Sequence, residues 1–396
     1  MNILIIDHDP NFTGSTISLI YLLKKLEKNN SLTVLTNKSG VEFQRLKDSS
    51  DIVLVKLPAV FNLNIHFNQD YKFFSPLGIY SLFLSIKRFV NGLLFAKRYI
   101  KQTKPDLVYV NEYVLMQFSL AAKSLGVEAI THVRSKFIDG NFGVRKLLIS
   151  KYLLKSNKKI IAISEIEKSQ FLIGKNRDTD KIFVVNEFLS SKDFDTSFDQ
   201  TEIKKRIGLN PNKIVVLFLG GIFNIKGSLL FLKAATVLLS KRSDVVILFI
   251  GDQSYHNSSE RKYYNECQKL IQDINLNNNF IEISEHIEIK DYFNICDIYV
   301  NANQVTHFAR PIIEAWAKKK SVVCSNTLHN CNLVSNNKDS LLFEKNDYND
   351  LAEKLELLLE NIELRNWIAK EGFEKASQYF NDEVTINQII KIISIA

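Results

Sequence analysis

The sequence predicts an α/β protein built from two doubly wound parallel-sheet domains. Short, continuous apolar runs rich in β-branched residues recur along the chain, as expected for strands that are buried on both faces. Amphipathic segments with a helical period separate these runs, and this alternation is typical of parallel sheets. The cycle is interrupted once near the middle, and 396 residues are long for a single core.

The first domain is expected over residues 1–190. An amphipathic segment at 17–28 predicts its first helix, and two longer helical segments, 84–104 and 142–159, combine leucines with lysines and arginines. Apolar runs predict its strands at 2–6, 32–36, 51–55, 106–110, 128–133, 159–163 and 182–186.

Residues 187–212 are polar and acidic, contain one short helical piece, and predict a linker. The cycle of strands and helices restarts after them, which predicts a second α/β domain over residues 191–375. Its strands are expected at 213–221, 245–252, 279–283, 297–303 and 321–326.

Composition and the first residues indicate a compartment. Asp7 and Asp9 lie close to the apolar start, which predicts a strand rather than a signal peptide and argues against export. The sequence has no uninterrupted apolar run of the roughly 18 residues that a membrane-spanning helix needs. Four cysteines without CxxC spacing suit a reducing compartment and indicate no metal site. We therefore expect a cytoplasmic protein.

The net charge of +8 is unevenly distributed. Residues 1–190 contain 27 Lys and Arg against 16 Asp and Glu, whereas the remainder contains 24 against 27. Such a basic half attracts anionic surfaces, and the helices at 84–104 and 142–159 have the character of basic helices that lie on anionic membranes. The alternative is that both are ordinary domain helices with charged outer faces. No aromatic stacking platform or reader motif indicates a nucleic-acid partner.

The turn after the first predicted strand contains Gly14 at the start of a helix. A glycine there lets an anion approach the backbone amides at the helix N-terminus. A plain strand–helix turn capped by Ser15 or Thr16 is the alternative. The turn has no GxGxxG pattern, so a dinucleotide site is not indicated.

A second turn follows the predicted strand at 213–221. Gly220 and Gly221 end the strand, and Lys226 and Gly227 lead into a helix that is expected to begin near Ser228. A lysine beside a helix N-terminus is disfavoured by the helix dipole and calls for a compensating anion such as a diphosphate. The alternative is a solvated turn lysine.

The stretch THFARPIIEAWA, residues 306–317, begins polar and becomes an apolar helical pattern with one carboxylate, Glu314. Pro311 fits the first position of a helix, and the amides of 308–310 lie just ahead of it. Glu314 is expected in the first turn, where the dipole alone favours a carboxylate by about 0.3–1 kcal/mol. The residue could therefore be a helix starter or could hold a ligand at the mouth of the helix.

Two further residues are expected at the edge of a cleft between the domains, since ligands bind at the carboxyl ends of the strands. His132 ends the strand at 128–133, where a purely structural histidine is the alternative. Arg134 follows it and could meet a phosphate or be solvated.

Several of these motifs together resemble the family 4 glycosyltransferases, which have the GT-B fold. GGIFNIKG is similar to the family's Gly-Arg-Leu-x-x-x-Lys-Gly phosphate clamp, and THFARPIIEAWA is similar to its Glu-Gly-Phe-Gly-Leu-Pro-x-x-Glu-Ala signature. The turn at Gly14 looks like the glycine-rich loop, VVNEF like the Val-Tyr-Asn-Gly-Val element, and the order and spacing of the motifs are compatible over almost the whole chain.

The resemblance implies a set of roles. Lys226 would contact the donor diphosphate, Glu314 the ribose hydroxyls, and His132 the donor sugar. The last helices, around 367–380, and a C-terminal helix over 376–396 would pack back on the first domain. The implied donor site also includes Gly14, Gly220, Gly221, Thr306, His307, Phe308, Ala309 and Arg310, with Ser15 and Arg134 as acceptor or phosphate candidates.

The sequence departs from the family pattern at several of these positions. Gly221 stands where the clamp usually has arginine, and Thr306 stands where the first glutamate of the signature is expected. His307 and Ala309 replace two glycines. These changes bear on sugar choice and on activity itself, because the missing groups would contact the donor.

The resemblance implies a retaining transferase that uses a UDP- or GDP-sugar and needs no essential metal or other cofactor. The expected acceptor is a glycan or a lipid-linked glycan of a bacterial surface polysaccharide. The expected location is the cytoplasm, with peripheral binding at the inner face of the membrane through the basic helices. A non-catalytic GT-B subunit that binds a glycan or a partner protein is the alternative.

Overall fold

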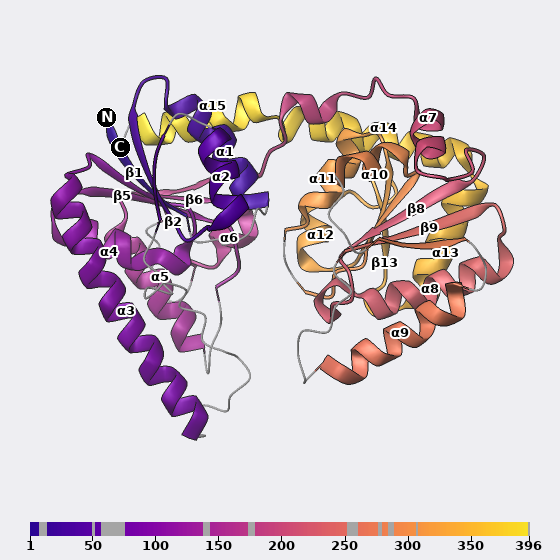
Figure 1. Cartoon of the computed structure of the whole chain (residues 1–396), viewed down its shortest axis with the longest axis horizontal. Coiled ribbons are helices and arrows are strands. Elements are labelled where there is room, and N and C mark those ends of the chain that lie inside the picture. Colours follow the sequence, from indigo (N-terminus) through magenta and orange to yellow (C-terminus); the bar gives the residue numbers. More distant parts are fainter. Residues whose placement is uncertain are drawn as a thin grey trace. The chain divides into compact units, whose positions relative to one another are not determined.

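The computed structural model describes residues 1–7, 14–49, 52–56, 76–137, 143–172, 179–251, 260–275, 279–283, 289–305 and 308–394. The chain divides into two compact units (Figure 1). The first unit comprises Met1–Phe188 and Asp382–Ala396, and the second comprises Leu189–Asn381. The predicted limits of 190 and 375 differ from these by a few residues at each crossing.

The first unit contains a parallel sheet in the order β3-β2-β1-β4-β5-β6-β7. Its strands are rich in branched apolar residues because both faces are covered. Leu19 and Ile389 belong to the core on one face, and Phe118 and Leu153 belong to the core on the other. The strands are β1 (Asn2–Asp7), β2 (Ser31–Thr36), β3 (Val53–Lys56), β4 (Leu107–Val110), β5 (Glu128–Val133), β6 (Lys159–Ala162) and β7 (Ile182–Val184).

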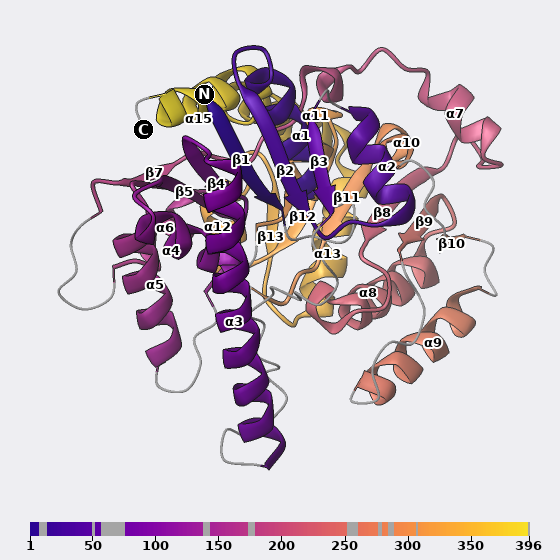
Figure 2. The ribbon, with the colours of Figure 1, turned by 60° about the vertical axis from the view of Figure 1, so that its left-hand side comes forward.

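The helices of the first unit cover the two faces of this sheet. One face is covered by α1 and α15, which contact each other, and the other by α3, α4 and α5 (Figure 2). The helices are α1 (Gly14–Leu26), α2 (Gly40–Ser49), α3 (Pro76–Thr103), α4 (Met116–Ser124), α5 (Val144–Ser156), α6 (Glu165–Ser169) and α15 (Asp382–Ser394).

The second unit repeats the same sheet topology, in the order β10-β9-β8-β11-β12-β13. The last strand was not predicted, because Leu341–Phe343 is too short for its period to be read. The strands are β8 (Ile214–Leu219), β9 (Val245–Ile250), β10 (Phe280–Ile283), β11 (Ile298–Asn301), β12 (Ser321–Ser325) and β13 (Leu341–Phe343). The helices are α7 (Gln200–Arg206), α8 (Ser228–Lys241), α9 (Arg261–Asn275), α10 (Ile289–Ile295), α11 (Arg310–Ala317), α12 (Leu328–Leu333), α13 (Tyr348–Glu360) and α14 (Ile362–Tyr379).

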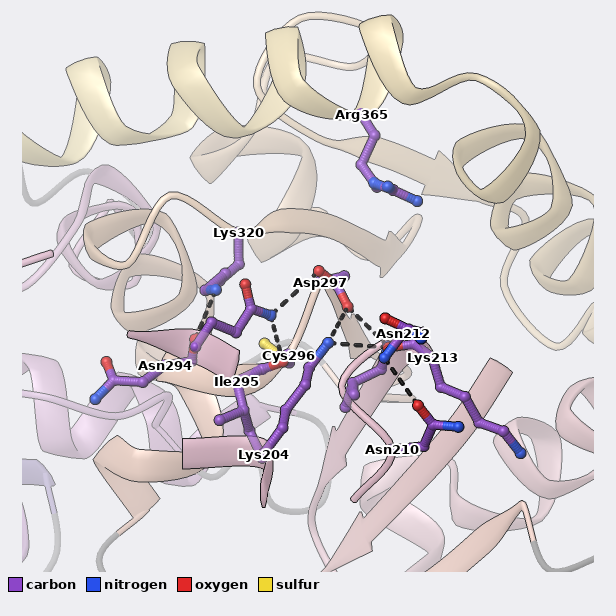
Figure 3. Close-up of polar contacts among 12 residues, drawn as sticks. Lys204, Asn210, Asn212, Lys213, Asn294, Ile295, Cys296, Asp297, Lys320 and Arg365 are labelled. Atoms are coloured by element: carbon purple, nitrogen blue, oxygen red, sulfur yellow. Dashed lines mark hydrogen bonds and ion pairs between the residues drawn. The ribbon is translucent and has the colours of Figure 1, made fainter. Parts of the chain in front are cut away.

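The predicted linker at 187–212 is largely a structural part of the second unit. Lys204 on α7 is buried, and its amine donates to the carbonyl of Lys213 at 2.9 Å and lies 3.4 Å from Asp297 Oδ2 (Figure 3). Asp297 also accepts the amide of Val215 at 2.8 Å, which joins α7 to the start of β8. The polar composition of this segment therefore reflects an ion pair of a buried lysine with a half-buried aspartate as well as solvation.

The chain passes between the units twice, and the two passages are paired. The amide of Leu189 donates to the carbonyl of Phe380 at 2.7 Å, and Leu189 and Asn381 form a parallel bridge. The expectation that residues 367–380 pack on the first domain is wrong, because they lie in α14, within the second unit and against α11. Of the two helices α14 and α15, it is α15 that packs in the first unit.

No helix among the described residues is both long enough and apolar enough to cross a membrane. Within the same residues, no group of three or more His, Cys, Asp or Glu side chains is placed to hold a metal ion. Cys267, Cys296 and Cys324 are buried free thiols, and burial raises the pKa of each, whereas Cys331 is exposed.

Candidate donor site

The carboxyl edge of the second sheet brings two of the predicted motifs together. Strands β8 and β11 are neighbours, but β8 leads on to β9 on one side and β11 leads on to β12 on the other. Ligands of doubly wound sheets bind at such a point, where the strand order reverses. Lys226 lies in the turn after β8, and Glu314 lies on α11, which follows β11. Both residues therefore come after strands that end at this point.

The turn after β8 depends on glycines for its shape. Gly227 has a φ of 71°, and a Cβ added there would lie 2.0 Å from the carbonyl oxygen of Ala302, directly after β11. A Cβ on Gly220 would lie 3.0 Å from Cβ and Cγ of Lys226. The glycines therefore let the Lys226 side chain lie across the strand end and let the turn pack against the neighbouring loop.

The Lys226 amine has the environment of an anion-binding group. The residue is half-buried, and desolvation lowers the pKa of its amine. No carboxylate in the described part of the chain forms an ion pair with it. Because a partly buried ammonium without a counter-ion is unfavourable, an anionic ligand would stabilise this arrangement. The burial also argues against a freely solvated turn lysine.

Tyr263 supports this turn, although sequence reasoning missed it. It extends from α9, and its hydroxyl accepts the amide of Leu229 at 2.8 Å in the first turn of α8. The side chain of Ser228 completes the support, because its hydroxyl donates to Gly221 O at 2.6 Å and accepts the amide of Phe223 at 3.1 Å. Desolvation raises the pKa of Tyr263 to about 12, so it stays a neutral phenol at physiological pH.

The structure places Glu314 differently from the sequence expectation. Helix α11 begins at Arg310, so Glu314 is its fifth residue and lies beyond the first turn. The expected position in the first turn is therefore wrong, and the alternative that the helix dipole alone explains this carboxylate loses its support, since the dipole effect falls off within that turn. Arg310 Nε lies 2.9 Å from Glu314 Oε1, an i,i+4 ion pair, and the Glu314 side chain is 27% exposed. The partly exposed carboxylate can still meet a ligand.

The residues that open α11 are described only in part. Thr306 and His307 lie outside the described residues, whereas Phe308 and Ala309 are buried. The Phe308 ring packs against Phe380, with 6.5 Å between ring centroids. The predicted role of the amides at 308–310 stays a prediction.

His132 ends β5 in the first unit and is buried. Its Nδ1 lies 2.7 Å from the hydroxyl of Tyr109, and its Nε2 is buried without a hydrogen-bond partner among the described residues. Desolvation, and then the charge of Arg134, lower the pKa of the imidazole well below its ordinary value. His132 is therefore a neutral side chain with one hydrogen-bonding atom left to offer.

Arg134 is part of a buried network rather than a solvated phosphate arm. It forms an ion pair with Glu187 and donates from Nε to Asn111 Oδ1 at 3.1 Å. Ser18 on α1 donates to the other oxygen of Glu187 at 2.8 Å. Sequence reasoning missed Glu187, whose only signal is an acidic residue where the similar family element has glycine.

The end of β1 is also occupied by charged groups. Asp7 accepts from Asn111 Nδ2 at 3.3 Å and pairs with Lys38 at 3.3 Å, and the side chains of Asp7 and Lys38 are fully buried. Helix α1 begins at Gly14, with Ser15 half-buried beside it. Residues 8–13 lie outside the described residues, and the anion-binding role expected of this turn stays a prediction.

The sequence profile of the family described as "Glycosyl transferases group 1" matches residues 199–375. The capsular polysaccharide biosynthesis glycosyltransferase CapM of Staphylococcus aureus is 26% identical over 230 residues, which cover 57% of this chain and 58% of CapM. The N,N'-diacetylbacillosaminyl-diphospho-undecaprenol alpha-1,3-N-acetylgalactosaminyltransferase of Campylobacter jejuni is 28% identical over 64% of this chain and 66% of its own. The chain thus spans about half the length of several curated relatives that it matches.

Solved structures resemble the chain over its whole length. The crystal structure of Anabaena HepE in complex with UDP-glucose has a TM-score of 0.78 at 18% identity and covers 100% of both chains. At this identity the likeness shows the fold, which is two Rossmann-like domains with the sheet order seen in each unit here. Residues 199–375 are therefore similar to the group 1 glycosyl transferases, in a chain that has the GT-B fold.

Proposed function

We propose that this chain is a retaining glycosyltransferase that transfers a sugar from a UDP- or GDP-sugar to a glycan or lipid-linked acceptor in bacterial surface polysaccharide biosynthesis, as in capsule, O-antigen, lipopolysaccharide or exopolysaccharide. The observation that carries the proposal is the half-buried amine of Lys226, which has no ion-pair partner among the described residues and lies where the strand order reverses. Relatives named for capsular and undecaprenol-linked glycan synthesis, and a UDP-glucose-bound structure of the same fold, support it.

The proposed chemistry is electrostatic. Negative charge develops on the diphosphate as the bond to the sugar breaks, and the Lys226 ammonium and the amides at the start of α11 would stabilise it. An acceptor hydroxyl attacks from the same face of the sugar. Glu314 would accept the ribose hydroxyls, and the free Nε2 of His132 would bond a sugar hydroxyl. Since protein groups supply the positive charge, we propose that no metal ion or other cofactor is essential.

The first test is calorimetry with UDP, GDP and their monophosphates. Lys226→Ala should weaken diphosphate binding by roughly 10–100-fold, the effect of a charged hydrogen bond, and should leave monophosphate binding nearly unchanged. Lys233→Ala is the matched control, because Lys233 lies on the adjoining helix α8 and pairs with Glu266 at 3.3 Å. Equal losses for diphosphate and monophosphate would contradict the assigned role of Lys226.

Glu314 is tested with the ribose itself. Glu314→Ala should weaken the binding of the preferred nucleoside diphosphate by a similar factor. The variant should have no effect on a 2′,3′-dideoxy analogue, which lacks the hydroxyls that the carboxylate would bind. If the variant weakens the binding of both ligands equally, the role of Glu314 is to stabilise α11 rather than to bind the ribose.

A non-catalytic GT-B subunit is the second candidate. The departures that favour it are Gly221 in place of the clamp arginine and Thr306 in place of the first signature glutamate. Incubation with a panel of nucleotide sugars decides between the two. A transferase should bind at least one nucleotide sugar and, without an acceptor, should hydrolyse it slowly to the sugar and the nucleoside diphosphate. A subunit should bind a glycan or a protein but no nucleotide sugar.

We also propose that the protein works in the cytoplasm, peripherally at the inner face of the membrane. An acceptor that is anchored in lipid would be available there. The excess of positive charge in residues 1–190 supports this location.

A further inference from the structure

Tyr109 and His132 form a buried polar pair near the carboxyl edge of the first sheet. Tyr109 lies on β4 and His132 on the neighbouring strand β5. The Tyr109 hydroxyl lies 2.7 Å from His132 Nδ1, and the two rings meet edge to face with 6.3 Å between their centroids. The hydrogen bond at Nδ1 decides which nitrogen of a neutral imidazole carries the proton. It therefore decides what the second nitrogen, Nε2, can offer to a ligand.

The direction of this hydrogen bond follows from the partners of the Tyr109 hydroxyl. The Arg134 side chain donates a hydrogen bond to the Tyr109 oxygen, and a guanidinium has no acceptor atom to give in return. In the part of the chain that the structure describes, His132 Nδ1 is the acceptor that the phenol O–H reaches. If Nδ1–H were the donor instead, the phenol hydrogen would be buried without an acceptor, which is unfavourable. Tyr109 is therefore the donor and Nδ1 the acceptor.

The position of Arg134 is fixed from two further sides. Its guanidinium pairs with Glu187, which follows β7, and its Nε donates at 3.1 Å to Asn111, which follows β4. Desolvation raises the pKa of the Tyr109 phenol, so the hydroxyl keeps its hydrogen. The hydrogen bonds thus run in one direction, from Arg134 to Tyr109 and from Tyr109 to His132. Because the imidazole is neutral and its Nδ1 accepts, the ring proton lies on Nε2, which is buried without a partner among the described residues.

We propose that Tyr109 is a positioning residue that holds His132 as the Nε2–H tautomer, so that His132 donates a hydrogen bond to a ligand oxygen and cannot act as a base. The ligand atom opposite Nε2 must then offer a lone pair, as a sugar hydroxyl does. The inference rests on the proposed function for the identity of that ligand, the donor sugar, but not for the tautomer. A hydroxyl of the acceptor glycan offers the same chemistry, and binding measured without an acceptor separates the two sources.

Nitrogen-15 NMR of the imidazole tests the tautomer without any ligand. In the unmodified protein, Nδ1 should have the chemical shift of an unprotonated nitrogen and Nε2 that of a protonated one, and the loss of both signals in His132→Gln assigns them. Tyr109→Phe keeps the ring but removes the hydroxyl, so the Nδ1 signal should move toward that of a nitrogen without a hydrogen bond. Tyr99→Phe, at a half-buried tyrosine on α3, is the matched control and should leave both signals unchanged. A protonated Nδ1, or an Nδ1 signal that Tyr109→Phe does not move, would overturn the proposal.

Calorimetry with UDP-glucose and GDP-glucose, and with their monodeoxy and monofluoro analogues, tests what Nε2 offers. A C–F group can accept a weak hydrogen bond but cannot donate one, and a C–H group at the same position does neither. At the hydroxyl that Nε2–H binds, the deoxy analogue should bind roughly two- to tenfold more weakly than the parent sugar nucleotide, the effect of one neutral hydrogen bond. The fluoro analogue should bind more tightly than the deoxy analogue, and this difference should vanish in His132→Ala. Equal binding of the two analogues at every position would overturn the proposal.

Tyr109→Phe on the same ligands separates positioning from support of the fold. The variant should weaken the parent sugar nucleotide by roughly two- to tenfold and should leave the binding of that deoxy analogue, and of UDP or GDP alone, nearly unchanged. Equal losses for all of these ligands would show that Tyr109 only supports the fold, which would overturn the proposal. An Nε2–H tautomer without any binding of a sugar nucleotide would contradict the proposed transferase alone. Binding of a sugar nucleotide with a protonated Nδ1 would contradict the role of Tyr109 alone.

Discussion

Burial controls the protonation of Glu112, which follows β4 and accepts the amide of Tyr113 at 2.8 Å. Desolvation raises the pKa of its carboxyl from 4.5 to about 7, against the opposing effect of hydrogen bonds and Arg134. Between about pH 4.5 and 7 the Glu112 carboxyl therefore keeps its proton in the folded chain and loses it in the unfolded chain. The resulting stability is complete below pH 4.5 and is lost as the pH rises toward 7.

We expect Glu112→Gln to remove this pH dependence. Between pH 5 and pH 8 the free energy of unfolding of the unmodified protein should fall by roughly 2 kcal/mol relative to the variant. Urea denaturation at several pH values measures the difference. Parallel pH profiles for the two proteins would show that Glu112 is ionised in the folded state.

Tyr263 gives a second prediction for a single residue. Tyr263→Phe removes the acceptor of the Leu229 amide and should loosen the turn that carries Lys226. Nucleoside diphosphate binding should weaken by roughly two- to tenfold, the effect of one neutral hydrogen bond. Calorimetry measures it, with Tyr264→Phe, one position along α9, as the control. An unchanged affinity would mean that the turn keeps its shape without this hydroxyl.

Lys226 and Glu314 could be proposed as site residues from the sequence because each belongs to a motif that is local in the chain. Tyr263 and Glu187 could not, because their roles come from contacts that folding creates. Tyr263 is 34 positions from Leu229, and Glu187 is 169 positions from Ser18. Composition and periodicity carry no information on such pairs.

At the scale of elements, α7 shows why the linker prediction was incomplete. A short polar helix between two apolar regions has the pattern of a solvated connection. The contact between Lys204 and Asp297 fixes it to the second sheet, and Lys320 is also buried in this cluster, where desolvation lowers the pKa of its amine (Figure 3). The strands, in contrast, were predicted closely, since their continuous apolar runs follow directly from burial on both faces.

Asp297→Ala should therefore destabilise the second unit. It leaves the buried Lys204 amine without its charge partner and the Val215 amide without its acceptor, at a cost of roughly 2–4 kcal/mol. Asp244→Ala, which breaks an exposed pair with Arg242, should cost less than about 1 kcal/mol. Both tryptophans, Trp316 and Trp367, lie in the second unit, so their fluorescence during urea unfolding measures it. Equal costs for the two variants would contradict the role given to α7.

At the scale of the whole molecule, the sequence predicted two α/β domains but placed the second crossing too early. The pattern remains helical through α14 and α15, so periodicity does not show where the chain leaves the second unit. The contacts do show it, because Ile389 on α15 is buried in the same core as Leu19 and Leu22 on α1.

Ile389→Ala should weaken the first unit by about 2–4 kcal/mol through the cavity it leaves. Hydrogen exchange should show the loss of protection in β1, β2 and β4 and little change in residues 189–381. Val384→Ala is the matched control on the same helix, because Val384 is 52% exposed. Loss of protection spread evenly over both units would show that they unfold together.

The two passages of the chain between the units also determine the order in which the units can fold during translation. The second unit is one continuous stretch, Leu189–Asn381, and can close as soon as it has emerged. The first unit needs α15, which is translated after the whole of that stretch. At usual elongation rates the apolar face of its sheet stays uncovered for roughly 10–40 seconds, the time in which Leu189–Asn381 is translated before α15. During that interval the nascent first unit, rather than the second unit, is the part that a chaperone would have to protect.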